Sequence, residues 1–138
     1  MEEPWWQSIA ILAGRLIFAG VFAMAAVFKF LGMDATASYI AAAGFPFSLF
    51  LAWVAAILET LLVLSFLTGA YFTEAALIAA AYVVFLAFAF HGPSRWQGNQ
   101  VEFGFFVNHF TFLAGLLFAA VKGPGRLLAL PYSLIGRF

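Results

Sequence analysis

The sequence contains no cysteine, and this absence excludes several kinds of chemistry. Disulfide bonds, thiol redox reactions, iron–sulfur clusters and thiolate-bound zinc all need cysteine sulfur. The chain also has little charge, because six Lys and Arg residues balance six Asp and Glu residues and charged residues make up only 9% of the 138 positions. Without a basic tract or a net positive charge, we expect no nucleic acid partner.

Apolar side chains, by contrast, are abundant. Hydrophobic residues make up 66% of the chain and the mean hydropathy is +1.06, whereas soluble domains have roughly 45–50% apolar and about 25% charged residues. A small domain leaves much of its chain exposed after folding, so a soluble fold of this size could not hide so much apolar surface. The composition predicts an integral membrane protein whose apolar surface is covered by the lipid bilayer.

Four apolar segments are long enough to cross a membrane, since a hydrocarbon core about 30 Å thick needs about 20 apolar residues in a helix. The predicted spans are residues 9–31, 47–67, 72–90 and 103–121. We therefore expect one all-α domain over residues 1–138, an integral membrane bundle of four transmembrane helices. The C-terminal tail, residues 122–138, is too short to span and is expected to lie along the membrane interface.

The distribution of positive charge predicts the orientation. An even number of spans places both termini on the same side of the membrane. That side carries the larger share of the cations, namely Lys122, Arg126, Arg137 and, nearest to it, Arg15. The positive-inside rule then predicts cytoplasmic termini. The N-terminal MEEPWWQS lacks the positive segment of a signal peptide, so we expect the first span to be retained.

Two opposite charges fall inside the predicted spans. A charge at the centre of a membrane costs roughly 2.5–3.5 kcal/mol even on the mild insertion scale. At 1.5 Å per residue, Arg15 lies about 9 Å into the first span and Glu59 about 12 Å from the same surface in the second. We expect these side chains to form an intramembrane ion pair. The pair could fix the register of the helices or handle a proton or ligand, and both interpretations stay open.

A second polar group is predicted near the opposite surface. Its members lie at or near the ends of the spans and are Lys29, His91, Glu102, Asn108 and His109. Glu102 and His109 are about 20° apart on one helix face. These side chains could line one pocket, in which Lys, His and Asn donate hydrogen bonds to the carbonyls of a quinone headgroup.

Other interpretations of this group remain open. Lys29 and His91 could reach water at the interface, and Asn108 could bond to a neighbouring helix. Haem ligation by His91 and His109 is a further possibility. Two histidines without a carboxylate–histidine pattern predict no metal site. The sequence has no Walker, Rossmann, nucleophile-elbow or zincin motif, so no catalytic residue is assigned.

In their order and spacing, these features resemble the DoxX family of small four-span bacterial membrane proteins. The resemblance begins with GRLIFAGVFAMAAVFKF in the first span and continues with YIAAAGFP, AAILET and the closing KGPGR. It implies a four-helix fold in the bacterial inner membrane, with both termini cytoplasmic. The positions that match the family pattern are Arg15, Lys29, Glu59, His91, Asn108, Lys122 and Arg126.

The resemblance also implies a function. A related small subunit belongs to a thiosulfate:quinone oxidoreductase, and another member is linked to a membrane-associated oxidoreductase complex used against oxidative stress. We therefore expect a membrane subunit of a quinone-linked electron-transfer assembly, with a non-covalently bound quinone and other membrane subunits as partners. A non-catalytic scaffold or accessory subunit is the alternative, and a small transporter or channel is a third hypothesis.

Two positions depart from the family pattern. Glu74 follows Thr73 where family members often have Arg, and Glu74 is expected to pair with Arg126 at the inner surface, close to Lys122. Val107 precedes Asn108 where members often have Lys. The second departure removes a cation from the predicted pocket and argues against the binding of thiosulfate or another anion.

Overall fold

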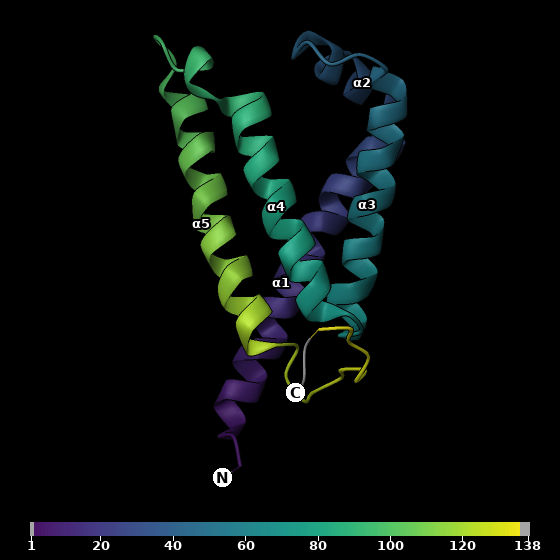
Figure 1. Cartoon of the computed structure of the whole chain (residues 1–138), viewed down its shortest axis with the longest axis vertical. Coiled ribbons are helices and arrows are strands. Elements are labelled where there is room, and N and C mark those ends of the chain that lie inside the picture. The colour runs from purple at the N-terminus through teal and green to yellow at the C-terminus, as the bar shows by residue number, and fades with distance from the viewer. Residues whose placement is uncertain (1, 136–138) are drawn as a thin grey trace. The chain divides into compact units, whose positions relative to one another are not determined.

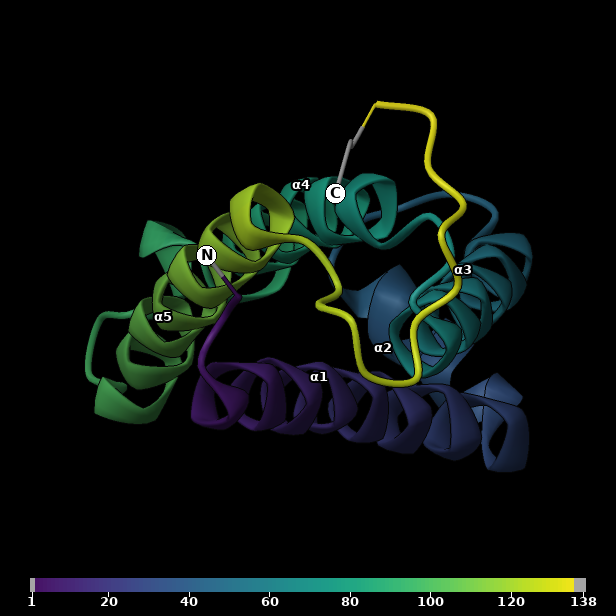
Figure 2. The same ribbon diagram turned by 90° about the horizontal axis from the view of Figure 1, so that it is seen from below.

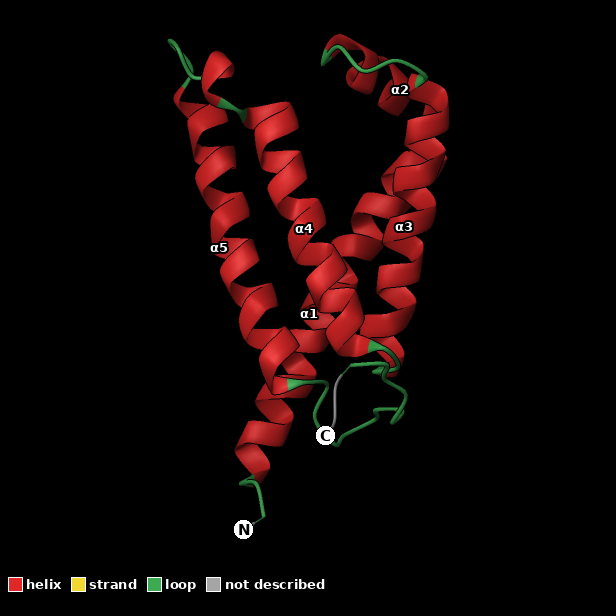
Figure 3. Ribbon diagram, viewed as in Figure 1, coloured by secondary structure: helices red, strands yellow, loops and turns green. Residues whose placement is uncertain are grey.

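The computed structural model describes residues 2–135, which form helices and loops (Figure 3). Figure 1 labels the helices in chain order. They are α1 (Trp5–Leu31), α2 (Met33–Ala42), α3 (Ser48–Thr68), α4 (Phe72–His91), the short 3-10 helix η1 (Pro93–Arg95) and α5 (Gln100–Lys122).

Four of these helices are long and apolar enough to cross a membrane: α1, α3, α4 extended by η1, and α5. The predicted all-α fold with four transmembrane helices is therefore confirmed. Each predicted span coincides with one of them. Among the starts of the spans, the largest shift is in α1, which begins at Trp5 rather than at residue 9 because the helix continues past the apolar run into the aromatic residues after Pro4.

The contacts within the chain divide into two compact units. The first unit is Met1–Tyr71 with Pro124–Tyr132, and the second is Phe72–Gly123 with Ser133–Phe138. The first therefore contains α1, α2, α3 and most of the tail. The second contains α4, η1 and α5. The two units are described in turn.

In the first unit, α1 packs against α3. The buried positions of α1 are Ser8, Arg15, Ala19, Phe22 and Ala26, and those of α3 are Ala52, Ala56, Glu59, Leu62 and Phe66. Steps of three, four or seven residues place each set on one helix face. The ring of Phe66 lies 5.7 Å, centroid to centroid, from the rings of both Phe18 and Phe22. The alanines let the helix backbones approach closely, as is common in membranes.

The short helix α2 lies between the first two spans, where the sequence analysis expects a loop. It packs on α3 and buries Ala37 and Ile40, which are three residues apart on one helix face. Ten residues of helix reach only about 15 Å and cannot cross a bilayer. Asp34 in its first turn lies near the positive end of the helix dipole, where a carboxylate is favourable. Small residues dominate α2, so its apolar period is weak in the sequence.

In the second unit, α4 packs against α5 as a hairpin (Figure 1). Near the open end of the hairpin, the Thr73 hydroxyl donates to the carbonyl of Ala120 over 3.2 Å. Toward the other end, the ring of Phe88 meets the edges of Phe106 and Phe110, with centroid distances of 5.2 and 6.1 Å. These contacts set the register of the two helices and so determine which polar side chains meet at the connecting loop.

The chain after α5 returns to the first unit. Gly123 ends the helix with a φ of 84°, and residues 124–132 run past α1 and then beside α3 (Figure 2). The amide of Leu130 donates to the carbonyl of Thr68, and the amide of Tyr71 donates to that of Tyr132. The predicted interfacial tail is thus packed on the ends of two helices over these residues. Residues 136–138 of the predicted tail lie outside the described residues.

Candidate functional site

Arg15 is buried, with 1% of its surface exposed, and it does not pair with Glu59 as the sequence analysis expects. Its guanidinium donates instead to four backbone carbonyls. The acceptors are Pro124 at 2.9 Å, Leu127 at 3.2 Å, Leu67 at 3.3 Å and Leu128 at 2.6 Å. The end of a helix and an irregular tail both leave carbonyls without helical partners. A guanidinium has enough donors to satisfy several of them at once.

The backbone around Arg15 is shaped to present those carbonyls. Leu128 has a φ of 47°, a left-handed conformation that non-glycine residues seldom adopt, and its carbonyl makes the shortest bond to Arg15. Gly69 ends α3 with a φ of 77°. A Cβ at Gly69 would lie 2.8 Å from the Cβ of Ala129 and 3.2 Å from Nη1 of Arg15. Gly69 thus permits both the turn and the close approach of the tail.

Glu59 pairs with Lys29 rather than with Arg15. Lys29 Nζ lies 2.9 Å from Glu59 Oε1, and the two side chains are 22% and 3% exposed. Lys29 is in the last turn of α1, yet its side chain reaches toward the middle of α3. Counting residues from the membrane surface missed this pair, because a lysine chain extends its charge several ångströms from its own backbone position.

Glu74 and Arg126, which are predicted to pair, belong to different units, and each has hydrogen-bond partners within its own unit. Arg126 Nε donates to the hydroxyl of Ser8 over 2.9 Å, within the first unit. In the second unit, Glu74 Oε1 accepts from the Ser133 hydroxyl at 2.9 Å and from the amides of Leu134 and Ile135. The hydroxyl and the amides of the irregular tail thus bind one oxygen of the carboxylate, Oε1. Lys122, the third residue of this predicted group, is exposed in the last turn of α5.

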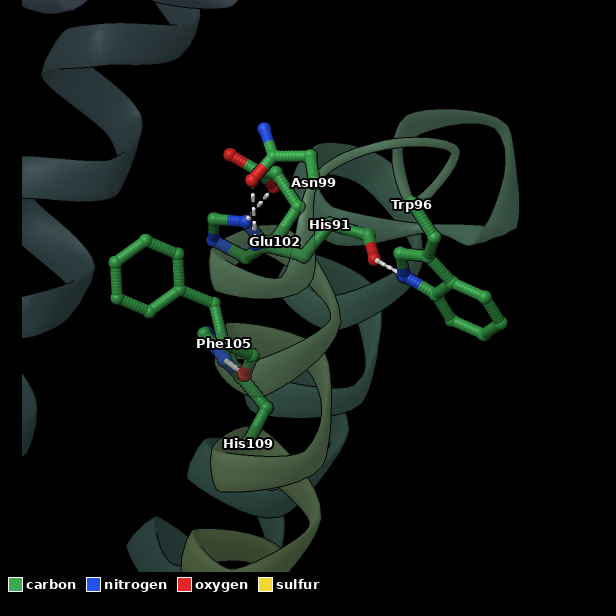
Figure 4. A network of polar contacts seen from close by, with 6 residues as sticks. All are labelled: His91, Trp96, Asn99, Glu102, Phe105 and His109. Carbon is green, nitrogen blue, oxygen red and sulfur yellow. Dashed lines mark hydrogen bonds and ion pairs between the residues drawn. The ribbon is translucent and has the colours of Figure 1, made fainter.

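The polar group of the second unit forms at the loop end of the α4–α5 hairpin (Figure 4). His91 Nδ1 lies 2.6 Å from Glu102 Oε2, and His109 Nδ1 lies 2.6 Å from the carbonyl oxygen of Phe105. The centroids of the two imidazole rings are 5.1 Å apart. Steps of three and four residues place Glu102, Phe105 and His109 on one face of α5. His91, at the end of α4, joins this row from across the hairpin.

The loop residues hold His91 and Glu102 in place. The Trp96 indole donates to the carbonyl of His91 over 2.7 Å, which satisfies an acceptor at the end of α4. The Asn99 side chain accepts from the amide of Glu102 over 3.2 Å and so caps α5. Both ends of the loop are therefore tied to the residues that carry the polar contact. The sequence gives the Asn99 cap as a local signal, but not the contact across the loop.

These contacts show which ring nitrogen of each histidine is engaged by the protein. A backbone carbonyl can only accept, so His109 carries a proton on Nδ1, and the carboxylate of Glu102 likewise orients Nδ1–H of His91 toward itself. In the described part of the chain, each imidazole therefore keeps its Nε2 atom available to a ligand. The side chains of His91 and Glu102 are 15% and 23% exposed, so the group is partly accessible.

Three of the five residues predicted for one pocket are thus brought together: His91, Glu102 and His109. Lys29 belongs to the first unit, where Glu59 is its partner. Asn108 is exposed on α5 and is turned about 100° from His109 around the helix. Aromatic rings complete the surroundings, since Phe105 lies 5.1 Å from His91 and Trp96 lies 4.9 Å from Phe106, centroid to centroid.

Comparison with known proteins identifies one family. The family model described as DoxX matches residues 10–92, which is more than half of the chain. The match includes Arg15, Lys29, Glu59 and His91 and stops before α5. Searches among curated proteins and among solved structures give no match.

Proposed function

Because the chain belongs to the DoxX family, we propose that this multi-pass membrane protein is a subunit of a quinone-linked electron-transfer assembly. The loop end of the α4–α5 hairpin contacts the quinone headgroup. The observation that carries the proposal is the His91–Glu102 contact of 2.6 Å, which holds one imidazole beside that of His109 through its Nδ1 atom. Both termini lie in the cytoplasm of a bacterium, so the hairpin loop lies at the outer face of the inner membrane.

The chemistry of the group suits such a headgroup. Imidazole nitrogens exchange hydrogen bonds with the oxygens of quinones and hydroquinones. A carboxylate behind the imidazole fixes its orientation, as in other carboxylate–histidine pairs. The rings of Phe105 and Trp96 offer flat apolar surfaces near the polar atoms. A partner subunit supplies the redox centre, since the chain has no cysteine for an iron–sulfur cluster.

Quinone binding to the purified full chain tests the proposal. Decylubiquinone or a short-chain menaquinone is titrated into the protein in detergent while tryptophan fluorescence is recorded, because Trp96 lies beside the group. Replacement of His91 by Phe removes one hydrogen bond and should weaken binding about tenfold, since 1.4 kcal/mol corresponds to a factor of ten. Thr111→Val, on an exposed face of α5, is the matched control and should bind as the wild type does.

Equal quinone affinity in the wild type and in His91→Phe would refute the proposed site. Helix content and thermal unfolding of each variant are measured in the same detergent, so that loss of binding is not confused with loss of fold. Co-purification from native membranes tests the wider proposal, because an electron-transfer subunit should bring a flavin-, haem- or iron–sulfur-containing partner with it.

A scaffold role is the second candidate, and one observation favours it. The charges buried in the first unit are engaged by internal partners, since Arg15 binds backbone carbonyls and Lys29 binds Glu59. A unit whose charges hold its own parts together suits a protein that packs beside larger neighbours. Under this hypothesis, His91→Phe leaves the activity of the purified assembly unchanged, whereas Lys29→Met lowers the amount of assembled complex.

A further inference from the structure

The two histidines of the hairpin share a feature with histidines that bind metals. A metal-bound imidazole almost always donates its other N–H to a carboxylate or a backbone carbonyl, which fixes the tautomer and directs the free nitrogen. His91 makes the first kind of contact, with Glu102, and His109 makes the second, with the carbonyl of Phe105. The expectation of no metal site assumed that no carboxylate–histidine pattern exists. The hairpin loop creates that pattern between residues far apart in sequence.

The spacing of the rings is compatible with one metal ion bound between them. A metal bound at about 2.0–2.1 Å from Nε2 lies about 3.2 Å from the ring centroid. Two imidazoles at a tetrahedral angle around one ion therefore have centroids about 5.2 Å apart, and two imidazoles on opposite sides of the ion have centroids about 6.4 Å apart. The observed separation is 5.1 Å. It matches the tetrahedral arrangement and is too short for two axial ligands of a haem.

We propose that His91 and His109 form a two-histidine site for Zn²⁺, bound through the Nε2 atoms, with water completing the tetrahedron. Zinc accepts imidazole ligands and prefers four-coordinate tetrahedral geometry. The described residues contain no cluster of three or more metal-ligating side chains, so the protein supplies two ligands. Glu102 and the carbonyl of Phe105 are positioning groups that hold the ligands.

The site has a consequence for the proposed function but does not depend on it. Zinc would occupy the same Nε2 atoms that face the quinone headgroup, so zinc and quinone should compete. Zinc binding itself requires only the histidine pair. The two proposals therefore fail separately: zinc can bind to a chain that binds no quinone, and quinone can bind to a chain that binds no zinc.

Metals are first removed from the purified full chain with a chelator. Zn²⁺ is then titrated into the protein in detergent, and binding is measured by calorimetry. We expect about one Zn²⁺ per chain. His91→Phe and His109→Phe should each weaken binding more than tenfold, because one of two protein ligands is lost. Glu102→Gln should weaken binding by about 10- to 100-fold, as loss of a carboxylate partner does in other sites. Thr111→Val is the matched control and should bind as the wild type does.

A second readout reports the ligands directly. Cu²⁺ is used as a spectroscopic probe, since imidazole also suits copper. Electron paramagnetic resonance of one equivalent of Cu²⁺ should show splitting from two nitrogens in the wild type and from one in either histidine variant. Thermal unfolding without metal confirms that the variants fold.

Three results would overturn the inference. The first is that Zn²⁺ does not bind to the wild type. The second is that it binds equally to the wild type and to both histidine variants, which would indicate adventitious surface binding only. The third is that only one of the two histidines matters, which would leave a single imidazole at the surface rather than a site.

Discussion

The two units of the molecule use their polar side chains in different ways. In the first unit, Arg15, Lys29 and Glu59 are turned inward and bind partners within the unit. In the second, His91 and His109 each commit one ring nitrogen to the protein and leave the other for a ligand. A charge inside a membrane is costly unless it is paired. An imidazole near the interface can leave one ring nitrogen without a protein partner at lower cost, because water is close. We therefore expect polar substitutions to cost more stability in the first unit than in the second.

The largest effect is expected when Lys29 is replaced by Met. The variant leaves the Glu59 carboxylate, 3% exposed, without its cation, and breaking a buried ion pair typically costs about 3–5 kcal/mol. Thermal or denaturant unfolding in detergent measures the loss. The double variant Lys29→Met, Glu59→Leu removes both charges and should recover most of the stability. If the double variant is as unstable as the single one, Lys29 does not act through Glu59.

Replacement of Arg15 by Met should have the next largest effect. It removes the donor for four backbone carbonyls at the junction of α3 and the tail, and an unsatisfied buried polar group costs about 1–3 kcal/mol. We expect a loss of about 2–4 kcal/mol, because some of these carbonyls can reach water when the tail is released. Faster proteolysis within residues 124–132 should accompany it. Arg95→Met, which removes an exposed cation from the loop, is the control and should change neither quantity.

A smaller loss of stability is expected from Gly69→Ala. The left-handed conformation and the contact with Ala129 both oppose a side chain there, at a cost of about 1–3 kcal/mol. Gly20→Ala in α1 is the matched substitution, because a Cβ there meets nothing within 4 Å. It should be neutral or stabilising by up to about 1 kcal/mol, as alanine favours helix over glycine. Equal effects of the two changes would show that residues 124–132 do not pack closely against Gly69.

The smallest effect on stability is expected from His109→Phe in the second unit. The substitution keeps a planar aromatic ring, only slightly larger than imidazole, beside His91, and the bond to a helix carbonyl is lost. We expect a change in unfolding free energy of about 1 kcal/mol or less. A loss as large as that of Lys29→Met would mean that His109 is a structural residue, and the contrast between the units would then fail.

The fold could be predicted from the sequence because it depends on long apolar runs. Such a run predicts a span without any knowledge of the residues that it contacts elsewhere in the chain. Each span is a property of about twenty consecutive residues. The site could be predicted only in part. His91, Glu102 and His109 are grouped in the sequence by their positions near helix ends, and the hairpin brings these positions into contact. Helix α2 was missed, since its small residues give a weak apolar period.

The polar partners were harder to predict than the helices. The acceptors of Arg15 are main-chain carbonyls in an irregular segment, and any residue type can supply a carbonyl. Lys29 reached Glu59 through the length of its side chain, which counting along a helix does not include. Glu74 accepts from amides of the tail, because those amides are left free where the helix has ended. In each case the partner was determined by backbone groups that lack a helical hydrogen bond or by the length of a side chain. The type of residue at a position does not show which backbone groups lie near it in the fold.

The bonds of Arg15 also constrain the order of events during synthesis. Three of its four acceptors, Pro124, Leu127 and Leu128, are more than 100 residues later in the chain. The arginine enters the membrane with the first helix, before the ribosome has made these residues. A nascent chain must therefore shelter the cation elsewhere, at the lipid surface or in the insertion machinery. The first helix can take its final position only after residues 124–128 have been made and have reached Arg15.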